Sequence, residues 1–168
     1  MSETTIKELT NAMVSGGNGL LREANRLFRP YGVTAAYFNV LNLLIDAPEG
    51  LRPSELTRSL VVDPSSTTYV LDQMEKRSWI KRAREPSDRR AHRILIGAAG
   101  KRLHGQVSPL YHAALKEMSE GINDRDAELV SRTILKVQHA AAAAIDRVIA
   151  RNPFTPPTKK QSRALKRT

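Results

Sequence analysis

The spacing of apolar residues along the chain predicts a mainly helical protein. Apolar residues recur near helical spacing over residues 4–29, 34–46, 98–118 and 124–151. Thr34 and Asn123 stand at the starts of two of these segments, where their side chains are good helix N-caps. Pro109 lies inside the third segment, so we expect that helix to be interrupted there.

The middle of the chain predicts two short helices joined by a tight turn. Pro53 opens "PSELTRSL", in which Leu56 and Leu60 face inward. Asp63 is a strong N-cap for a second helix that begins at Pro64 and continues to about residue 77. This arrangement matches a helix-turn-helix.

The second short helix separates into an apolar and a polar face. Its inward stripe consists of Thr67, Val70, Leu71 and Met74. Its outward face consists of Ser65, Ser66, Thr68, Tyr69, Asp72, Gln73 and Lys76. Small hydroxyl residues let a helix approach a DNA major groove closely, and Gln73 or Tyr69 can reach base edges or phosphates. A solvated face with serines that only suit a helix cap is an equal alternative for this helix alone.

A β-hairpin is predicted to follow, with strands over 79–84 and 91–96 and a six-residue turn over 85–90. Arg89 and Arg90 lie at its tip beside Asp88. An arginine at a hairpin tip can enter a minor groove, and a nearby carboxylate can orient its guanidinium group. The alternative is a solubilising turn with an incidental ion pair.

The distribution of charge favours an anionic partner. The chain has 168 residues, which fits one domain, and its net charge is +10. Residues 75–105 hold 10 basic and 3 acidic residues, a net of +7, and residues 151–168 hold 6 basic and no acidic residues. Nucleic acid is the simplest partner for such a field. We expect the tail, residues 151–168, to be disordered and to add affinity without specificity.

Several classes of protein are not expected. There is no cysteine, so disulfides and thiol chemistry are excluded. We find no secretory signal and no apolar run near the ~18 residues of a membrane span, so a cytoplasmic protein without membrane contact is expected. No catalytic motif, cofactor site or metal motif appears around the histidines, and we do not expect an enzyme. These histidines are His92, His104, His112 and His139.

Residues 51–100 resemble the DNA-binding core of the MarR family, the multiple-antibiotic-resistance regulators. The family's first short helix ends here as "LTRSL", its second as "MEKRS", and its wing signature reads "RAREPSDRR". The order and spacing of these pieces agree with the family. Four positions depart from it. Ser78 replaces a usual glycine, Gly97 replaces a usual threonine cap, and Tyr69 and Gln73 stand where arginine is common.

The resemblance implies a winged helix-turn-helix fold, mainly α with a small antiparallel β wing, in a helical homodimer. Residues 1–50 and 98–150 would form the dimerisation region, and residues 51–97 would bind double-stranded DNA. The function implied is a transcriptional regulator, most simply a repressor, on a palindromic operator, with a small aromatic or phenolic effector as a further expectation. The residues expected to contact DNA are Ser54, Ser65, Ser66, Thr68, Tyr69, Gln73, Lys76, Arg84, Asp88, Arg89 and Arg90.

Two alternatives remain open. The basic tail and high net charge also suit a protein that coats DNA without reading its sequence. A zinc-responsive regulator would be possible if His104 or His112 met other ligands across a dimer.

Overall fold

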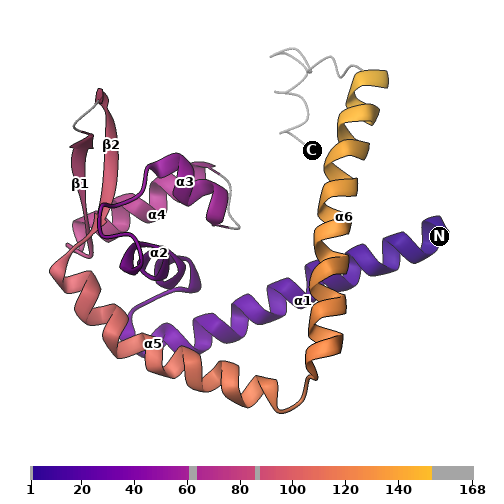
Figure 1. Ribbon diagram of the computed structural model, residues 1–168, viewed down its shortest axis with the longest axis horizontal. Helices are drawn as coiled ribbons and strands as arrows, with labels where there is room; N and C mark the ends of the chain where they lie inside the picture. Colours follow the sequence, from indigo (N-terminus) through magenta and orange to yellow (C-terminus); the bar gives the residue numbers. More distant parts are fainter. Residues whose placement is uncertain (1, 61–63, 86–87, 153–168) are drawn as a thin grey trace, which may run out of the picture. The chain divides into compact units, whose positions relative to one another are not determined.

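The computed structural model describes residues 2–60, 64–85 and 88–152, and its elements follow the predicted order (Figure 1). The chain divides into two units, Met1–Glu120 and Gly121–Thr168, of which the second carries α6. The mainly helical fold with one antiparallel hairpin confirms the expected fold class. The elements are α1 (Glu3–Phe28), the short 3₁₀ turn η1 (Arg29–Tyr31), α2 (Ala35–Ile45), α3 (Pro53–Ser59), α4 (Pro64–Lys76), β1 (Ile80–Glu85), β2 (Asp88–Ile96), α5 (Ala98–Ser119) and α6 (Asp124–Arg151).

Local capping explains where several helices begin. The side chain of Thr34 accepts a hydrogen bond from the backbone N–H of Tyr37 at the start of α2, as predicted. Asn123 likewise accepts from the N–H of Asp126 at the start of α6. Gly97 precedes α5 with extended backbone angles. The predicted cap at Asp63 lies outside the described residues.

The core of the first unit consists of two apolar clusters that share neighbours. The first joins α2, α3, α4 and the hairpin, and the second joins α1, α2 and α5. Tyr37, Trp79 and Leu103 pack against both clusters, so the helix-turn-helix and the flanking helices form one continuous interior. The most deeply buried members are Phe28, Phe38, Val40, Leu41, Leu44, Leu56, Leu71, Met74, Ile94 and Val107.

The hairpin is joined to the chain segment that leads into α3. Its strands pair antiparallel, with Ile80 opposite Ile96 and Arg82 opposite Ile94. Leu51 forms a bridge to the hairpin, because its N–H donates to the Ile94 carbonyl at 3.0 Å and the Ile94 N–H donates back at 2.7 Å. Gly50, at φ +75°, brings the backbone close enough for this bridge, since a Cβ there would lie 2.6 Å from the Ile94 carbonyl oxygen.

Two local expectations were wrong. The predicted six-residue turn is shorter, because β1 continues to Glu85, which pairs with Asp88 after a register shift. Backbone pairing does not depend on side-chain type, so charged residues can extend the ladder. The predicted interruption at Pro109 is absent from α5, which continues through it. Val107 and Tyr111 pack into the α1–α2–α5 cluster on either side of the proline, and this packing favours the uninterrupted helix.

Helix α4 ends in a Schellman motif with a serine at its left-handed position. Ser78 has φ +57°, its N–H donates to the Glu75 carbonyl, and the N–H of Trp79 donates to the Met74 carbonyl. The absence of the usual glycine at this position therefore has a structural cost. The turn sends Trp79 directly into the hairpin.

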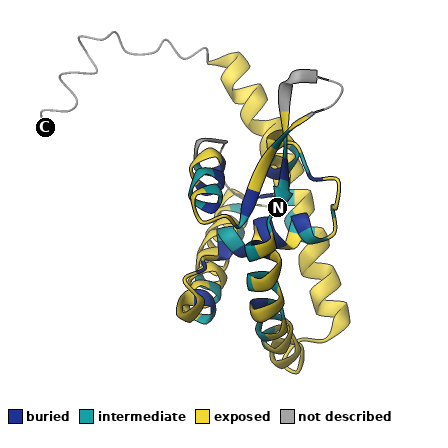
Figure 2. Cartoon of the chain, turned by 90° about the vertical axis from the view of Figure 1, so that its left-hand side faces the viewer, coloured by how far each residue is buried: buried dark blue, intermediate teal, exposed yellow. Residues whose placement is uncertain are grey.

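The described part of the second unit contains one long helix, α6, with apolar side chains on its surface. Figure 2 shows α6 almost entirely in the colour of exposed residues. None of the helices that the structure describes combines the length and apolar character that crossing a membrane requires. The apolar residues exposed on α6 include Leu129, Val130, Leu135, Ile145, Val148 and Ile149.

Candidate nucleic-acid interface

Helix α4 has the two faces that its sequence predicts. The inward stripe of Thr67, Val70, Leu71 and Met74 is buried. On the other face Tyr69 is 64% exposed. Thr68 and Lys76 are also exposed, whereas Ser66 and Gln73 are half-buried. The helix therefore presents a polar surface, with small side chains in its first turns, that a DNA groove can accommodate.

The other predicted contact residues lie on α3 and the hairpin of the same unit. Ser54 on α3 and Arg84 on β1 are exposed. Ser65, Asp88, Arg89 and Arg90 belong to elements whose backbone is described, but their side chains lie outside the described part of the structure. Contact with DNA stays a prediction for all of the expected residues.

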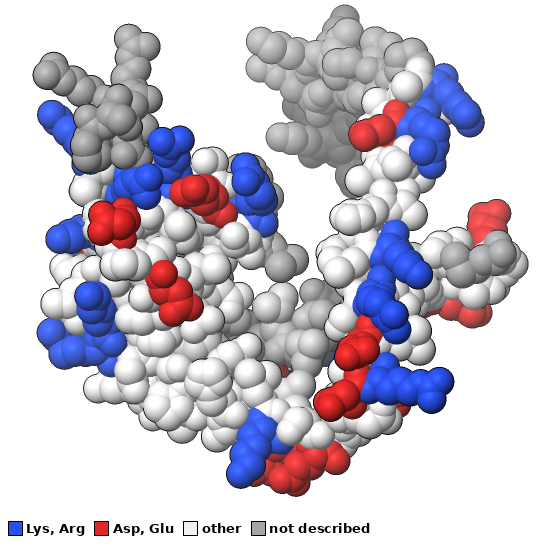
Figure 3. Space-filling model, viewed as in Figure 1, with Lys and Arg blue, Asp and Glu red and all other residues white. Residues whose placement is uncertain are grey.

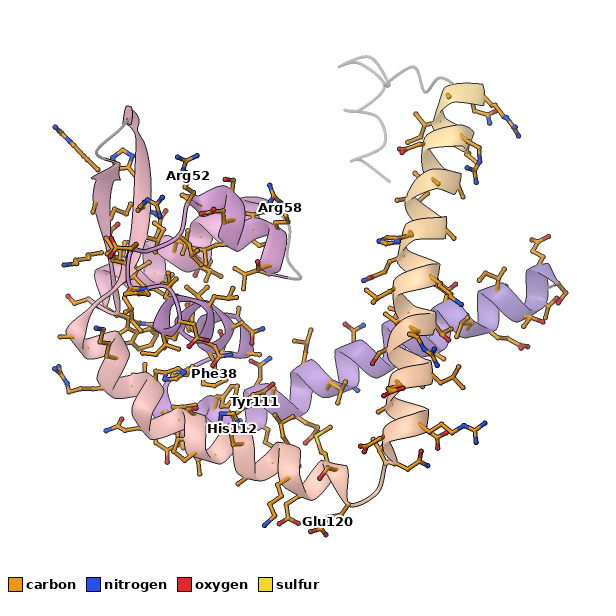
Figure 4. The ribbon with its side chains drawn as sticks, viewed as in Figure 1. Phe38, Arg52, Arg58, Tyr111, His112 and Glu120 are labelled. Carbon is orange, nitrogen blue, oxygen red and sulfur yellow. The ribbon has the colours of Figure 1, made fainter. Side chains whose placement is uncertain are left out.

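Two arginines near α3 were missed by the sequence reasoning. Arg52 and Arg58 are exposed, and Figure 4 shows them projecting from the two ends of α3 toward the side to which the hairpin points. They were overlooked because charge was summed over residues 1–74, where 6 basic and 8 acidic residues nearly cancel. A sum over the helix-turn-helix alone, residues 51–77, would not have revealed them either, because 4 basic and 4 acidic residues cancel there.

Arg82 connects α4 to the hairpin. One of its guanidinium nitrogens donates to the carboxylate of Asp72 at 2.5 Å, and the other donates to that of Glu75 at 2.5 Å. Both carboxylates belong to α4, and Arg82 belongs to β1. Asp72 had been placed on the outward face of α4 by its position in the sequence, and the structure shows that it binds the wing.

A cation–π group holds the end of α4 at its junction with the hairpin. The guanidinium of Arg77 lies 5.2 Å from the ring centre of Tyr37 and 5.0 Å from that of Trp79. The two rings meet edge to face at 5.6 Å. Since Tyr37 is in α2, this group connects the end of α4 to the core.

An aromatic group lies between α2 and α5. Phe38 contacts Tyr111 with a ring separation of 5.0 Å and stacks on His104 at 5.8 Å (Figure 4). Burial lowers the pKa of His104 below its ordinary value of 6.5, while Asp46 raises this pKa and His112 lowers it. The Nε2 atom of His104 lies 3.2 Å from Oδ1 of Asn42. Among the described residues, no group of three or more acidic or histidine side chains could hold a metal ion.

Charge is distributed unevenly over the first unit. Figure 3 shows basic side chains gathered at the end that carries the hairpin, with acidic side chains between them. Lys76 at the end of α4 and Lys81 and Arg84 on β1 are exposed. A surface of this kind can lie along a phosphate backbone while the outward face of α4 meets the bases.

Comparison with known proteins shows where this architecture occurs. The chain is 25% identical over 118 residues to the uncharacterized HTH-type transcriptional regulator YsmB of Bacillus subtilis, covering 70% of this chain and 80% of that protein. It is 24% identical over 131 residues to the transcriptional repressor MprA of Escherichia coli, covering 77% of this chain and 74% of that protein.

Solved structures share the fold over most of the chain. CouR from Rhodococcus jostii RHA1, bound to p-coumaroyl-CoA, matches with a TM-score of 0.67 and 26% identity, covering 79% of this chain and 93% of that one. A mutant MarR from E. coli complexed with operator DNA matches with a TM-score of 0.69 and 24% identity, covering 77% and 93%. The sequence model of the MarR family matches residues 31–91, which include α2 to α4 and most of the hairpin. Over these residues the chain resembles the MarR family, and its fold is that of the solved MarR-type structures.

Proposed function

We propose that this protein is a transcriptional repressor that binds a palindromic operator as a homodimer. Helix α4 would enter the major groove, and the hairpin would reach the adjacent minor groove. The observation that carries this proposal is the outward face of α4, with Tyr69 exposed beside a basic hairpin that Arg82 fixes to the same helix. The MarR structure complexed with operator DNA, whose fold this chain shares, supports it.

The apolar surface of α6 supports the homodimer. A 28-residue helix with large apolar side chains exposed along it is costly in water. A second copy of the chain is the partner that a palindromic operator requires, because protein two-fold symmetry is matched by DNA two-fold symmetry.

The same proposal includes release of the protein from its operator when a small aromatic molecule binds. CouR, at 26% identity, is bound to p-coumaroyl-CoA. In this chain the aromatic side chains of Phe28, Phe38 and Tyr111 meet between α1, α2 and α5. A thermal-shift screen of aromatic acids and their thioesters would identify an effector. A compound that raises the unfolding midpoint and weakens operator binding would qualify.

Footprinting on the DNA upstream of the chain's own gene and of its neighbours tests the DNA-binding function. We expect protection of one palindromic site at a salt concentration that releases random DNA. Equal binding to operator and random DNA would instead favour the DNA-coating alternative, in which the excess of basic residues acts without base readout.

Arg90→Ala tests the role of the hairpin tip in the same assay. We expect operator binding to weaken by roughly 1–3 kcal/mol, the scale of one good groove contact. Asp88→Ala should cost less, because it removes an orienting partner but also a negative charge near phosphate. Binding of Arg90→Ala that equals wild type would show that the tip is only a solvated turn.

A further inference from the structure

We propose that Arg82 is a positioning residue that sets the angle between the DNA-facing helix and the wing, and that base discrimination depends on it. We call Asp72, Glu75 and Arg82 the helix–wing clamp. The inference rests on the proposed function. In that function α4 and the hairpin bind two DNA grooves at the same time, and the clamp would hold them at the angle that this requires.

The position of Arg82 in the hairpin follows from the strand pattern. Ile80 and Ile94 are buried, and Arg82 lies opposite Ile94 in the strand register. Because side chains alternate along a strand, Arg82 is on the same face as Ile80. This face of the hairpin packs on α4, so Arg82 lies on the inner face of the hairpin, at the edge of the apolar core.

The partners of Arg82 are placed by the helix period. Leu71 and Met74 are buried against the hairpin core, and Asp72 and Glu75 each follow one of them by a single residue. Residues three apart lie on one side of a helix, so the two carboxylates form a pair beside the buried stripe. The guanidinium spans both, with one nitrogen on each.

The clamp is better suited to orientation than to stability. Its side chains are 32%, 45% and 38% exposed for Arg82, Asp72 and Glu75. Ion pairs with this much water contribute little to the free energy of unfolding. A planar guanidinium that binds two separate carboxylates nevertheless fixes direction, which a single ammonium group cannot do.

The clamp also neutralises acidic groups where DNA is expected. Asp72 and Glu75 are the acidic residues of α4, and unpaired carboxylates there would repel phosphates. An effect of charge must therefore be separated from an effect of geometry. The double variant Arg82→Met with Glu75→Gln does this, because it removes one charge of each sign and keeps the net charge of the wild type.

Lys81→Met is the matched control. Lys81 is exposed, adjoins Arg82 in β1 and lies on the opposite face of the hairpin. The Lys81→Met variant therefore loses one positive charge and leaves the three residues of the clamp unchanged. Fluorescence anisotropy would measure Kd for operator and for random DNA with each protein at one salt concentration, and the ratio of the two values is the discrimination.

For the double variant we expect the discrimination to fall by about 5- to 50-fold, the scale of one misplaced groove contact, while Kd for random DNA stays within about 2-fold of wild type. Lys81→Met should weaken both Kd values alike and keep the discrimination. A double variant that discriminates as well as wild type, or a control that loses as much, would overturn the proposal.

Hydrogen exchange separates failure of the clamp from failure of the proposed function. In the double variant, amide exchange should be faster in α4 and β1 and unchanged in α1 and α5. Unchanged exchange in α4 and β1 would overturn the role proposed for the clamp, even if the protein binds an operator. A wild type that binds operator and random DNA equally would overturn the proposed function and, with it, the link to base discrimination. If the double variant does not fold, Arg82→Lys can be measured in the same way. This variant keeps the positive charge of Arg82 but cannot bind two carboxylates in the same planar geometry. We expect it to lose part of the discrimination between operator and random DNA, and full retention of the discrimination would overturn the proposal.

Discussion

Ser78 shows how a single residue can oppose the turn in which it lies. Its φ of +57° places its Cβ close to the following carbonyl oxygen, which costs about 1–2 kcal/mol for a residue other than glycine. The hydrogen bonds of the Schellman motif and the packing of Trp79 hold it there. Position 78 is therefore a site where stability can be gained.

We expect Ser78→Gly to stabilise the protein by about 1 kcal/mol, because glycine adopts this conformation without strain. Urea unfolding followed by circular dichroism would measure the gain. Ser78→Ala keeps the Cβ and serves as the control, for which no gain is expected. A Ser78→Gly variant that unfolds at lower urea would show that the serine side chain stabilises the turn by another route.

His104 links stability to pH. Because burial lowers its pKa below 6.5 in the folded protein, the unfolded chain takes up the proton more readily. Proton uptake by the unfolded chain lowers the free energy of unfolding. This loss of stability is absent above pH 6.5 and grows as pH falls through 6.5 toward the pKa of His104 in the folded protein. We expect the urea midpoint to fall between pH 7.5 and pH 5.5, and to fall less in His104→Gln. Identical pH dependence in the two proteins would contradict this assignment.

At the scale of elements, α5 carries two glycines in contrasting surroundings. A Cβ at Gly100 would lie 2.1 Å from the carbonyl oxygen of Trp79, whereas nothing lies within 4 Å of one at Gly105. Gly100 thus marks a close approach of α5 to the start of the hairpin. Gly105 only weakens its own helix.

Gly100→Ala should destabilise the protein by about 1–3 kcal/mol, because backbone must move to accept the methyl group. Gly105→Ala should stabilise it by up to about 1 kcal/mol, since alanine is the better helix former. Thermal unfolding of the two variants, measured beside wild type, shows whether each substitution raises or lowers the unfolding temperature. Equal effects would mean that the close contact of α5 with Trp79 is not maintained in solution.

Most elements could be predicted from the sequence, because their signals are local. Thr34 and Asn123 mark helix starts through hydrogen bonds to residues three positions away, and the buried stripe of α4 follows the helix period. The length of the hairpin turn and the continuity of α5 at Pro109 could not, since strand pairing and packing against distant helices decide them. The outward face of α4 was also predicted.

The helix–wing clamp was not predictable in the same way. Arg82 and Asp72 are ten residues apart, and their meeting depends on how the hairpin packs across α4. The alternation that puts Arg82 on the face of Ile80 was visible in the sequence, but the orientation of that face relative to α4 was not. Tertiary geometry determines which of several charged residues become partners.

At the scale of the whole molecule, α6 needs a partner for its apolar side chains. Ile145 lies among the exposed apolar residues of α6. Ala143, two residues earlier, is rotated about 200° around a helix from Ile145. A charged residue at each of these positions therefore separates an effect on one face from a general effect on the helix.

Ile145→Glu should weaken the homodimer strongly, while Ala143→Glu should leave it nearly unchanged, because only the first places a charge in the apolar surface. Sedimentation equilibrium at micromolar concentration would measure both against the monomer mass of 18.7 kDa. A wild type that sediments as a monomer would exclude the dimer. Equal dissociation of the two variants would place the interface elsewhere.

The bridge between Leu51 and Ile94 has a consequence for how the operators of this protein can evolve. It joins the hairpin to the segment before α3, so in the proposed complex α3, α4 and the hairpin would meet a half-site together. Substitutions on the outward face of α4 can then change which bases are preferred without altering how these elements sit in the grooves. In the proposed homodimer, the contact between the two copies would set the distance between half-sites. The base sequence of each half-site and the spacing between the two half-sites would then be able to change separately during evolution.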